Sequence, residues 1–296
     1  MSFINIAILL LLIFSVTFLP LFLHQRKIKE NQKQRYLQGL LWLKTFKALL
    51  TNIQQHRGLT MGYLHGDSSL LPRINIIKEA INKQIKEINI KKGWVSDNQI
   101  WNGINDHWLR LSINYTKYES SHNFRQHGNL IINILNLIEE CADNHHLQEL
   151  LTSDKDNANF LWSQLLTTAE HIGQVRAIGT SIAAAKIYSP SQKIKLNYLQ
   201  NCIDKFLTQQ NHALNTQLLK ELLQTINRKI LSERVDISAE AFFNLATSAL
   251  DIVLDKFDIY IDELQTGIST KKQSPKSPQD ASSAISSETR ARGHYR

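Results

Sequence analysis

The chain has 296 residues, of which 43% are hydrophobic, and it contains 11 glycines and 5 prolines. This length suffices for one large or two small domains, and so few helix breakers favour long helices over a turn-rich β architecture. The net charge is +8, but basic and aromatic side chains do not interleave, so nucleic acid is not predicted as a partner. Cys141 and Cys202 belong to no CxxC motif; we interpret them as buried small hydrophobes and leave a disulfide open.

The first predicted element is an apolar stretch, Phe3 to Leu23, that contains no charged residue. As a helix rising about 1.5 Å per residue it spans about 31 Å, the thickness of a bilayer core. No Lys or Arg precedes it and its end is bulky, which favours a retained transmembrane anchor (residues 1–25) over a cleaved signal peptide. The basic residues follow this span. They predict a single-pass protein of a bacterial inner membrane, with lipid around its first helix and its main part in the cytoplasm.

Apolar residues at helical spacing continue the first helix to about residue 65. Ser189–Pro190–Ser191–Gln192 is a typical helix start, with a serine cap, proline at the first helical position and glutamine at the third. No stretch has the periodicity of a strand, so the fold class is all-α, with a helical part over 26–267 and a disordered tail over 268–296. Further helices are predicted over 69–90, 97–119, 122–143, 155–186, 190–231 and 236–267.

Two arginines, Arg57 and Arg176, have similar surroundings in the middle of predicted helices, with glutamine before them and small residues after them. Glycine inside a helix costs about 0.5–1 kcal/mol, so its recurrence indicates helices that approach closely. A charge buried in such a seam needs a partner. Two guanidinium groups that face each other repel, and a small planar oxyanion between them removes the repulsion.

A structural role is the alternative for both arginines. Each could form an ion pair with an acid such as Glu170 or Asp251, and the sequence leaves this open.

The chain resembles the nitrate- and nitrite-sensing (NIT) domain over roughly residues 38–265. The resemblance is carried by an Arg-Gly motif after a glutamine stretch, by a second arginine in a later helix, and by an aromatic segment followed by Ala, Thr and Asp. The matching segments are Gln54-Gln55-His56-Arg57-Gly58, Gln174-Val175-Arg176-Ala177-Ile178-Gly179 and Glu240 to Asp251.

The resemblance implies long antiparallel helices in two four-helix-type bundles, and nitrate or nitrite held between helices by Arg57 and Arg176. His56 stands where the family carries a further arginine and is the third candidate ligand group, with a structural histidine as the alternative. The family's signalling role implies an unknown signalling protein as a partner and a possible homodimer.

No P-loop, nucleophile motif, kinase set or zinc signature is present, so we predict neither an enzyme nor a metal or other cofactor. The favoured interpretation is a membrane-anchored, sensor-like binding protein. The alternative is a helical scaffold that has lost its ligand and docks a partner.

Overall fold

The computed structural model describes residues 3–91, 93–153, 157–209 and 216–270, with the side chains of these ranges from Phe18 onwards, except that of residue 209. This part of the chain is helical apart from short connections and one isolated antiparallel bridge between Leu151 and Asn157. The predicted all-α class is therefore confirmed. The α-helices are α1 (Phe3–Leu64), α2 (Leu71–Ile90), α3 (Gln99–Asn114), α4 (Ser120–Asn144), α5 (Leu166–Ala185), α6 (Pro190–Gln209), α7 (Gln217–Thr225) and α8 (Ala239–Thr270).

The predicted membrane anchor is not found. In the part of the chain that the structure describes, no helix is both long enough and apolar enough to cross a bilayer. The described side chains of α1 begin at Phe18, and any span of about 20 residues from there includes Arg26, Lys27 and Lys29. This finding contradicts the prediction of a single-pass inner-membrane protein. The side chains of residues 3–17, on which that prediction mainly depends, lie outside the described part.

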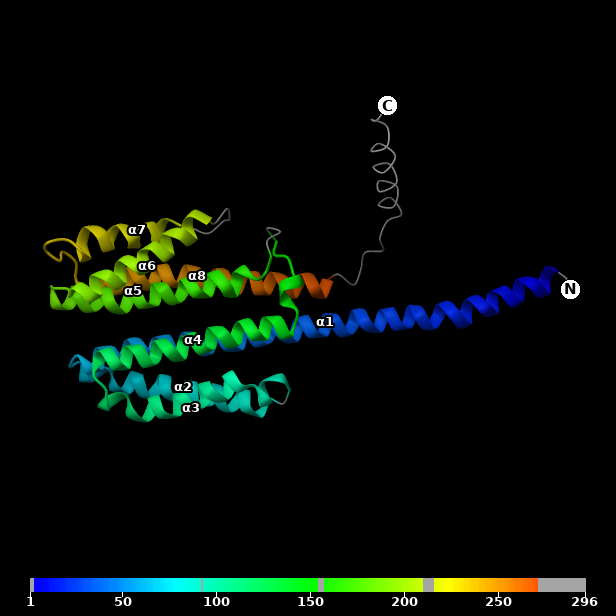
Figure 1. Ribbon diagram of the computed structural model, residues 1–296, viewed down its shortest axis with the longest axis horizontal. Coiled ribbons are helices and arrows are strands. Elements are labelled where there is room, and N and C mark those ends of the chain that lie inside the picture. The colour runs from blue at the N-terminus through cyan, green and yellow to red at the C-terminus, as the bar shows by residue number, and fades with distance from the viewer. Residues whose placement is uncertain (1–2, 92, 154–156, 210–215, 271–296) are drawn as a thin grey trace, which may run out of the picture.

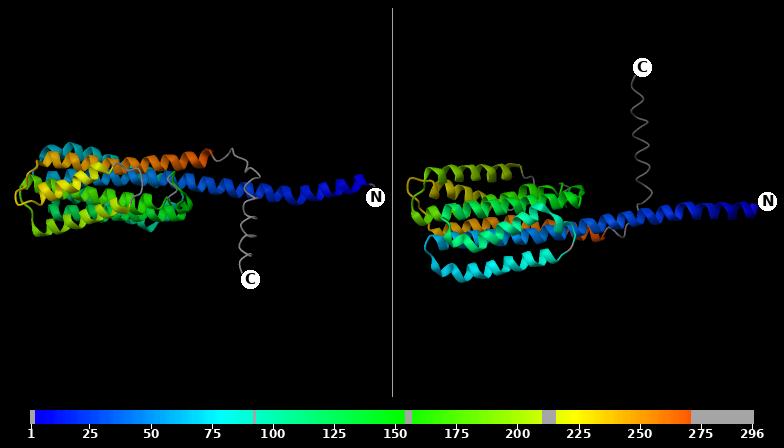
Figure 2. Two further views of the ribbon diagram at one scale, coloured as in Figure 1. Left: turned by 90° about the horizontal axis from the view of Figure 1, so that it is seen from above. Right: turned by 60° about the horizontal axis from the view of Figure 1, so that its bottom comes forward.

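The helices form two groups along a common long axis (Figures 1 and 2). In one group α1 packs against α2 and α4, and α3 packs against α4. In the other, α5 packs against α6 and α8, and α7 packs against α6 and α8. Helix α1 also contacts α5 and α8, so it joins the two groups, and its N-terminal end projects beyond the other helices (Figure 1).

The apolar stripe of α1 explains why this helix lies at the centre. Most of the stripe is fully buried, including Leu40, Phe46 and Leu50, whereas Leu41 is 54% exposed. Burying one such side chain contributes about 1.5–3 kcal/mol. Trp101 and Trp108 of α3 are also buried, and their indole N–H groups donate to Asn89 and Asn82 of α2 at 2.8 and 2.9 Å. The polar edge of each indole is thereby satisfied at the α2–α3 contact.

The predicted helix start at residue 190 is confirmed. The backbone N–H of Gln192 donates to Ser189 Oγ at 3.2 Å, and the backbone N–H of Ser189 donates to Gln192 Oε1 at 2.8 Å. This reciprocal pair is a capping box. The single helix predicted over 190–231 is instead two helices, α6 and α7, and residues 210–215 between them lie outside the described part.

The helix predicted from residue 155 begins only with a π-helix, Leu161–Leu165, that leads into α5 at Leu166. Other predicted ends shift by a few residues. Helix α1 ends at Leu64, and Gly66 follows with φ of 105°, a conformation that glycine adopts without strain. Asp67 then accepts a hydrogen bond from Ser69 N at 3.1 Å and starts the next turn. Helix α8 continues to Thr270, past the predicted end at 267, and the rest of the predicted tail lies outside the described residues.

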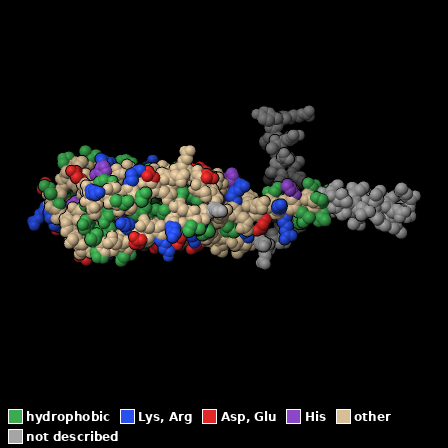
Figure 3. Space-filling model, turned by 90° about the horizontal axis from the view of Figure 1, so that it is seen from below, with side chains coloured by type: hydrophobic (Ala, Val, Ile, Leu, Met, Phe, Trp, Pro, Cys, Tyr) green, Lys and Arg blue, Asp and Glu red, His purple; other side chains and the backbone are tan. Residues whose placement is uncertain are grey.

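The surface and the cysteines agree with a compact helical protein. Basic and acidic side chains are interspersed on the face shown in Figure 3. Cys141 is buried in α4, Cys202 is half-buried in α6, and both are free thiols, so the disulfide left open by the sequence is not formed.

Candidate functional site: a cavity between α1 and α5

Arg57 of α1 and Arg176 of α5 line the same cavity. Its volume is about 470 Å³, and Phe243 of α8 closes part of it. Most of the remaining wall consists of small side chains on α1 and α5, such as Gly58 and Ala177. The two arginine motifs, which are far apart in the sequence, thus meet at one place in the fold.

Arg57 is neutralised by a carboxylate from the opposite helix. The side chain is 1% exposed, and its Nη1 and Nη2 donate to Glu170 Oε1 and Oε2 at 2.6 and 3.2 Å. Gln54 and Gln174 each donate a further bond to Glu170, both at 2.8 Å. A bidentate pair with all its oxygens satisfied offsets the cost of burying two charges. The structural alternative therefore applies to Arg57.

Arg176 has no such partner. Among the described residues no carboxylate oxygen lies within 4 Å of its guanidinium, which donates to Thr247 Oγ1 at 3.1 Å and lies 5.1 Å from the centroid of the Phe243 ring. Burial and the charge of Arg57 lower the pKa of Arg176, while Asp251 and Glu170 act in the opposite direction. An arginine remains charged in proteins, so this shift expresses an unfavourable environment for the cation.

The ionic groups of the cavity leave one positive charge. Arg57 and Glu170 cancel, and Arg176 remains. Two further polar atoms of lining residues, Thr180 Oγ1 and Gln54 Oε1, are buried and have no hydrogen-bond partner in the described part of the chain. A group that brings one negative charge and hydrogen-bonding atoms would complement this arrangement.

The glycines of the two motifs have different roles. A Cβ on Gly173 would lie 2.9 Å from Arg57 Nη2, so the absence of a side chain at Gly173 leaves room for the guanidinium of Arg57 against α5. A Cβ on Gly179 would lie 2.1 Å from Phe242 Cε1, which marks a close approach of α5 to α8. A Cβ on Gly58, in contrast, would meet no heavy atom within 4 Å. Close packing therefore explains Gly179, while Gly58 leaves room in the cavity.

His56 does not line this cavity. It is fully buried on the side of α1 that faces α3 and α4, with its ring 5.0 Å from Trp108 and 5.4 Å from Tyr115. His127 Nδ1 lies 2.9 Å from Asn123 O and therefore carries the proton, so His127 Nε2 accepts from His56 Nδ1 at 2.8 Å. Consecutive residues of a helix point about 100° apart, which separates His56 from Arg57.

Desolvation holds both histidines in the neutral form. Burial, with a smaller contribution from Lys78, lowers the pKa of His56 to about 3. Burial lowers the pKa of His127 well below its usual value, and protonation of His56 would lower it further. A neutral histidine supplies no charge for an anion, so the three candidate residues divide into two arginines in the cavity and one histidine in the core.

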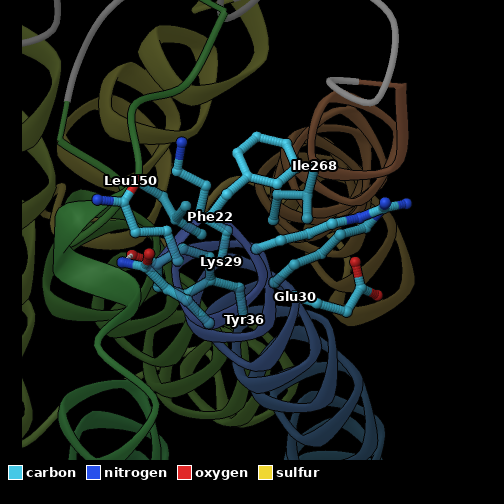
Figure 4. Close-up of a pocket in the computed structure, with 10 residues that line it drawn as sticks. Phe22, Lys29, Glu30, Tyr36, Leu150 and Ile268 are labelled. Carbon is cyan, nitrogen blue, oxygen red and sulfur yellow. Dashed lines mark hydrogen bonds between the residues drawn. The ribbon is translucent and has the colours of Figure 1, made fainter. Parts of the chain in front are cut away.

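A larger cavity, of about 630 Å³, lies beside the projecting part of α1 (Figure 4). Phe22, Lys29 and Tyr36 of α1 line it together with Leu150 and Ile268. Most of its wall is exposed side chain, and exposed charges are screened by solvent and salt. The smaller cavity holds the half-buried guanidinium of Arg176, which has no carboxylate within 4 Å among the described residues, and is therefore the better candidate.

Several residues of the site have roles that the sequence motifs did not reveal. Gln54 and Gln174 support the carboxylate of Glu170, and Phe243 and Thr247 hold Arg176 from α8. The glutamines stand beside each arginine in the sequence, and one helical turn separates Phe243 from Thr247. These patterns were visible, but the partner of each side chain required the packing of α5 against α1 and α8.

Comparison with known proteins gives a likeness of fold. No family model matches the chain, and no curated protein matches it. A solved structure, that of the NasR transcription antiterminator, is similar with a TM-score of 0.64 and 15% sequence identity. The likeness covers 85% of this chain and 74% of that one. At this identity it shows a shared helical fold.

Proposed function

We propose that this protein is a sensor-like binding module that takes up nitrate or nitrite in the cavity between α1 and α5. The observation that carries the proposal is the guanidinium of Arg176, which lines a cavity and has no carboxylate within 4 Å among the described residues. Its parallel N–H donors suit a planar oxyanion. The resemblance of the Arg57 and Arg176 segments to the nitrate- and nitrite-sensing domain supports the same choice of ligand.

In this proposal the two arginines have different roles. Arg176 binds the anion directly, while Arg57 stays paired with Glu170 and fixes the position of α5 against α1. The hydroxyl of Thr180 can donate one further bond. The anion would cancel the net charge between α1, α5 and α8, and so favour the arrangement in which these helices are close. A signalling partner would then recognise that arrangement.

A second candidate function has its own observation. The Arg57–Glu170 pair is complete without a ligand, as expected for a scaffold whose helices are held by an internal ion pair. In this alternative the cavity has no physiological anion and the helical surface docks a partner.

Thermal unfolding of the full chain tests the first proposal. The chain is titrated with nitrate and with nitrite, and with chloride as reference, at constant ionic strength. A ligand at 100 times its dissociation constant adds about 2.7 kcal/mol and raises the midpoint by several degrees. We expect this rise with nitrate or nitrite and not with chloride.

Two variants locate the effect. Arg176→Gln should abolish the rise, whereas Arg228→Gln, which removes the same charge from an exposed position outside the cavity, should retain it. A rise that survives Arg176→Gln contradicts the proposed site. If no oxyanion shifts the midpoint at millimolar concentration, the scaffold is favoured.

A further inference from the structure

The cavity is much larger than the anion proposed for it. A volume of about 470 Å³ lies within the range of about 300–1,000 Å³ that is typical of sites for organic ligands. Nitrate has four heavy atoms and fills about the space of one or two water molecules, at about 30 Å³ each. Arg176 would hold such an ion at one position and leave most of the cavity unfilled.

The rest of the lining is mostly apolar. Apart from the two arginines and the polar residues Gln54, His65, Thr180 and Ser181, the cavity is lined by glycines, alanines, Met61 and Phe243. Phe243 is 41% exposed, and its ring lies against the guanidinium of Arg176. A charged head and an apolar wall thus lie side by side in one cavity. Apolar atoms that leave water for such a wall gain free energy in proportion to their buried area.

We propose that the cavity accepts an organic monocarboxylate, with the carboxylate on Arg176 and a short apolar chain along the small-residue wall of α1 and α5. The carboxylate is a planar oxyanion of one negative charge, so it matches the guanidinium and the net charge of the site. The inference rests on the anion site of the proposed function and extends its ligand class.

Gly58 provides a way to separate the two halves of the site. A Cβ at this position meets no heavy atom within 4 Å, so Gly58→Leu adds bulk to the apolar part without a clash at Cβ. Gly103 of α3 is an exposed helical glycine with equally open surroundings outside the cavity, and Gly103→Leu is the matched control.

The experiment measures the dissociation constants of formate, acetate, propionate, butyrate and hexanoate for the full chain by calorimetry, with nitrate and chloride at the same ionic strength. Each buried methylene should tighten binding roughly four-fold, which corresponds to about 0.8 kcal/mol. Hexanol, which has the chain without the charge, serves to detect binding to apolar surface alone. Circular dichroism and the unfolding midpoint verify that each variant is folded.

In the unmodified protein, affinity for the carboxylates should increase with chain length. This increase should disappear in Gly58→Leu and remain in Gly103→Leu. In Arg176→Gln all carboxylate binding should be lost. Equal affinities along the series, or hexanoate binding that survives Arg176→Gln or is matched by hexanol, would overturn the inference. Nitrate binding with a flat carboxylate series would leave the proposed function intact and refute the inference. Carboxylate binding that tightens with chain length, without nitrate binding, would support the inference and refute nitrate as the ligand of the proposed function.

Discussion

Arg57 and Glu170 join α1 to α5 through two parallel hydrogen bonds of 2.6 and 3.2 Å. Both side chains are nearly inaccessible to solvent, and the carboxylate accepts two further bonds from glutamines. The pair therefore belongs to the class of buried ion pairs in which each member depends on the other.

Glu170→Gln should lower the free energy of unfolding by about 3–5 kcal/mol, because it leaves the charge of Arg57 buried without a counter-charge. Urea unfolding of the full chain measures this change. The double variant Arg57→Met with Glu170→Met removes both charges and should recover most of the loss. A single variant that costs less than about 1 kcal/mol would mean that water in the adjoining cavity hydrates Arg57.

The neutral His56–His127 pair makes stability depend on pH. The pKa of both side chains is lowered in the folded protein, so below about pH 6.5, and for His56 down to about pH 3, the unfolded chain binds more protons. The contribution of the pair is fully present above pH 6.5 and is lost as the pH falls. Between pH 6.5 and pH 5 the free energy of unfolding should therefore decrease, by at most about 2.7 kcal/mol per pH unit for two histidines.

Urea unfolding at several pH values tests this slope. A variant with His56→Gln and His127→Gln keeps hydrogen-bonding groups but cannot titrate, and its slope in this range should be smaller than that of the unmodified chain. His122→Gln is the control, since His122 lies outside the pair, and it should keep the slope. Identical slopes in all three proteins would show that the pair is not the source.

The two glycines that follow the arginines should respond to alanine in opposite ways. Gly58→Ala adds a methyl group to open space in a helix and should stabilise by about 0.5–1 kcal/mol. Gly179→Ala places the methyl group against the ring of Phe242 and should destabilise by about 1–3 kcal/mol. Urea midpoints at fixed pH compare the two. Equal effects would contradict the packing of α8 on α5 described above.

The two thiols should differ in reactivity. Cys141 is fully buried, and burial raises its pKa, so the thiolate that reacts with disulfide reagents is scarce and inaccessible. Cys202 is half-buried. In the native chain an aromatic disulfide reagent should therefore modify Cys202 first, and both cysteines only after unfolding in urea. Fast modification of Cys202→Ser in the native state would disagree with this order.

The sequence predicts the helical elements well where a local signal exists. The capping box at Ser189 and the apolar stripe of α1 depend on neighbouring residues alone, and both are found as expected. The extent of predicted helices is less accurate. No proline or glycine lies between α6 and α7, so a single helix is predicted across them, although five consecutive polar residues, 208–212, interrupt the apolar spacing there. The first helix was assigned to a membrane from composition, which does not report what surrounds a helix.

The candidate site could be predicted in part. The similar surroundings of Arg57 and Arg176 predict that the two helices meet, and Glu170 is one of the acids that the sequence offers as a partner. The sequence did not reveal that the pairing is unequal, with Arg57 satisfied and Arg176 left without a carboxylate within 4 Å among the described residues. That difference depends on the rotation of α5 relative to α1 and α8, which no local pattern specifies.

Helix α1 contributes side chains to both helix groups at once. Most of the other helices contact only members of their own group. Detachment of α1 would therefore remove packing contacts from both groups. The two groups should therefore behave as one cooperative unit, in which amide protons of α3 and of α6 become exchangeable through the same rare opening. The molecule has two groups of helices, but because they share α1 it should unfold in a single transition.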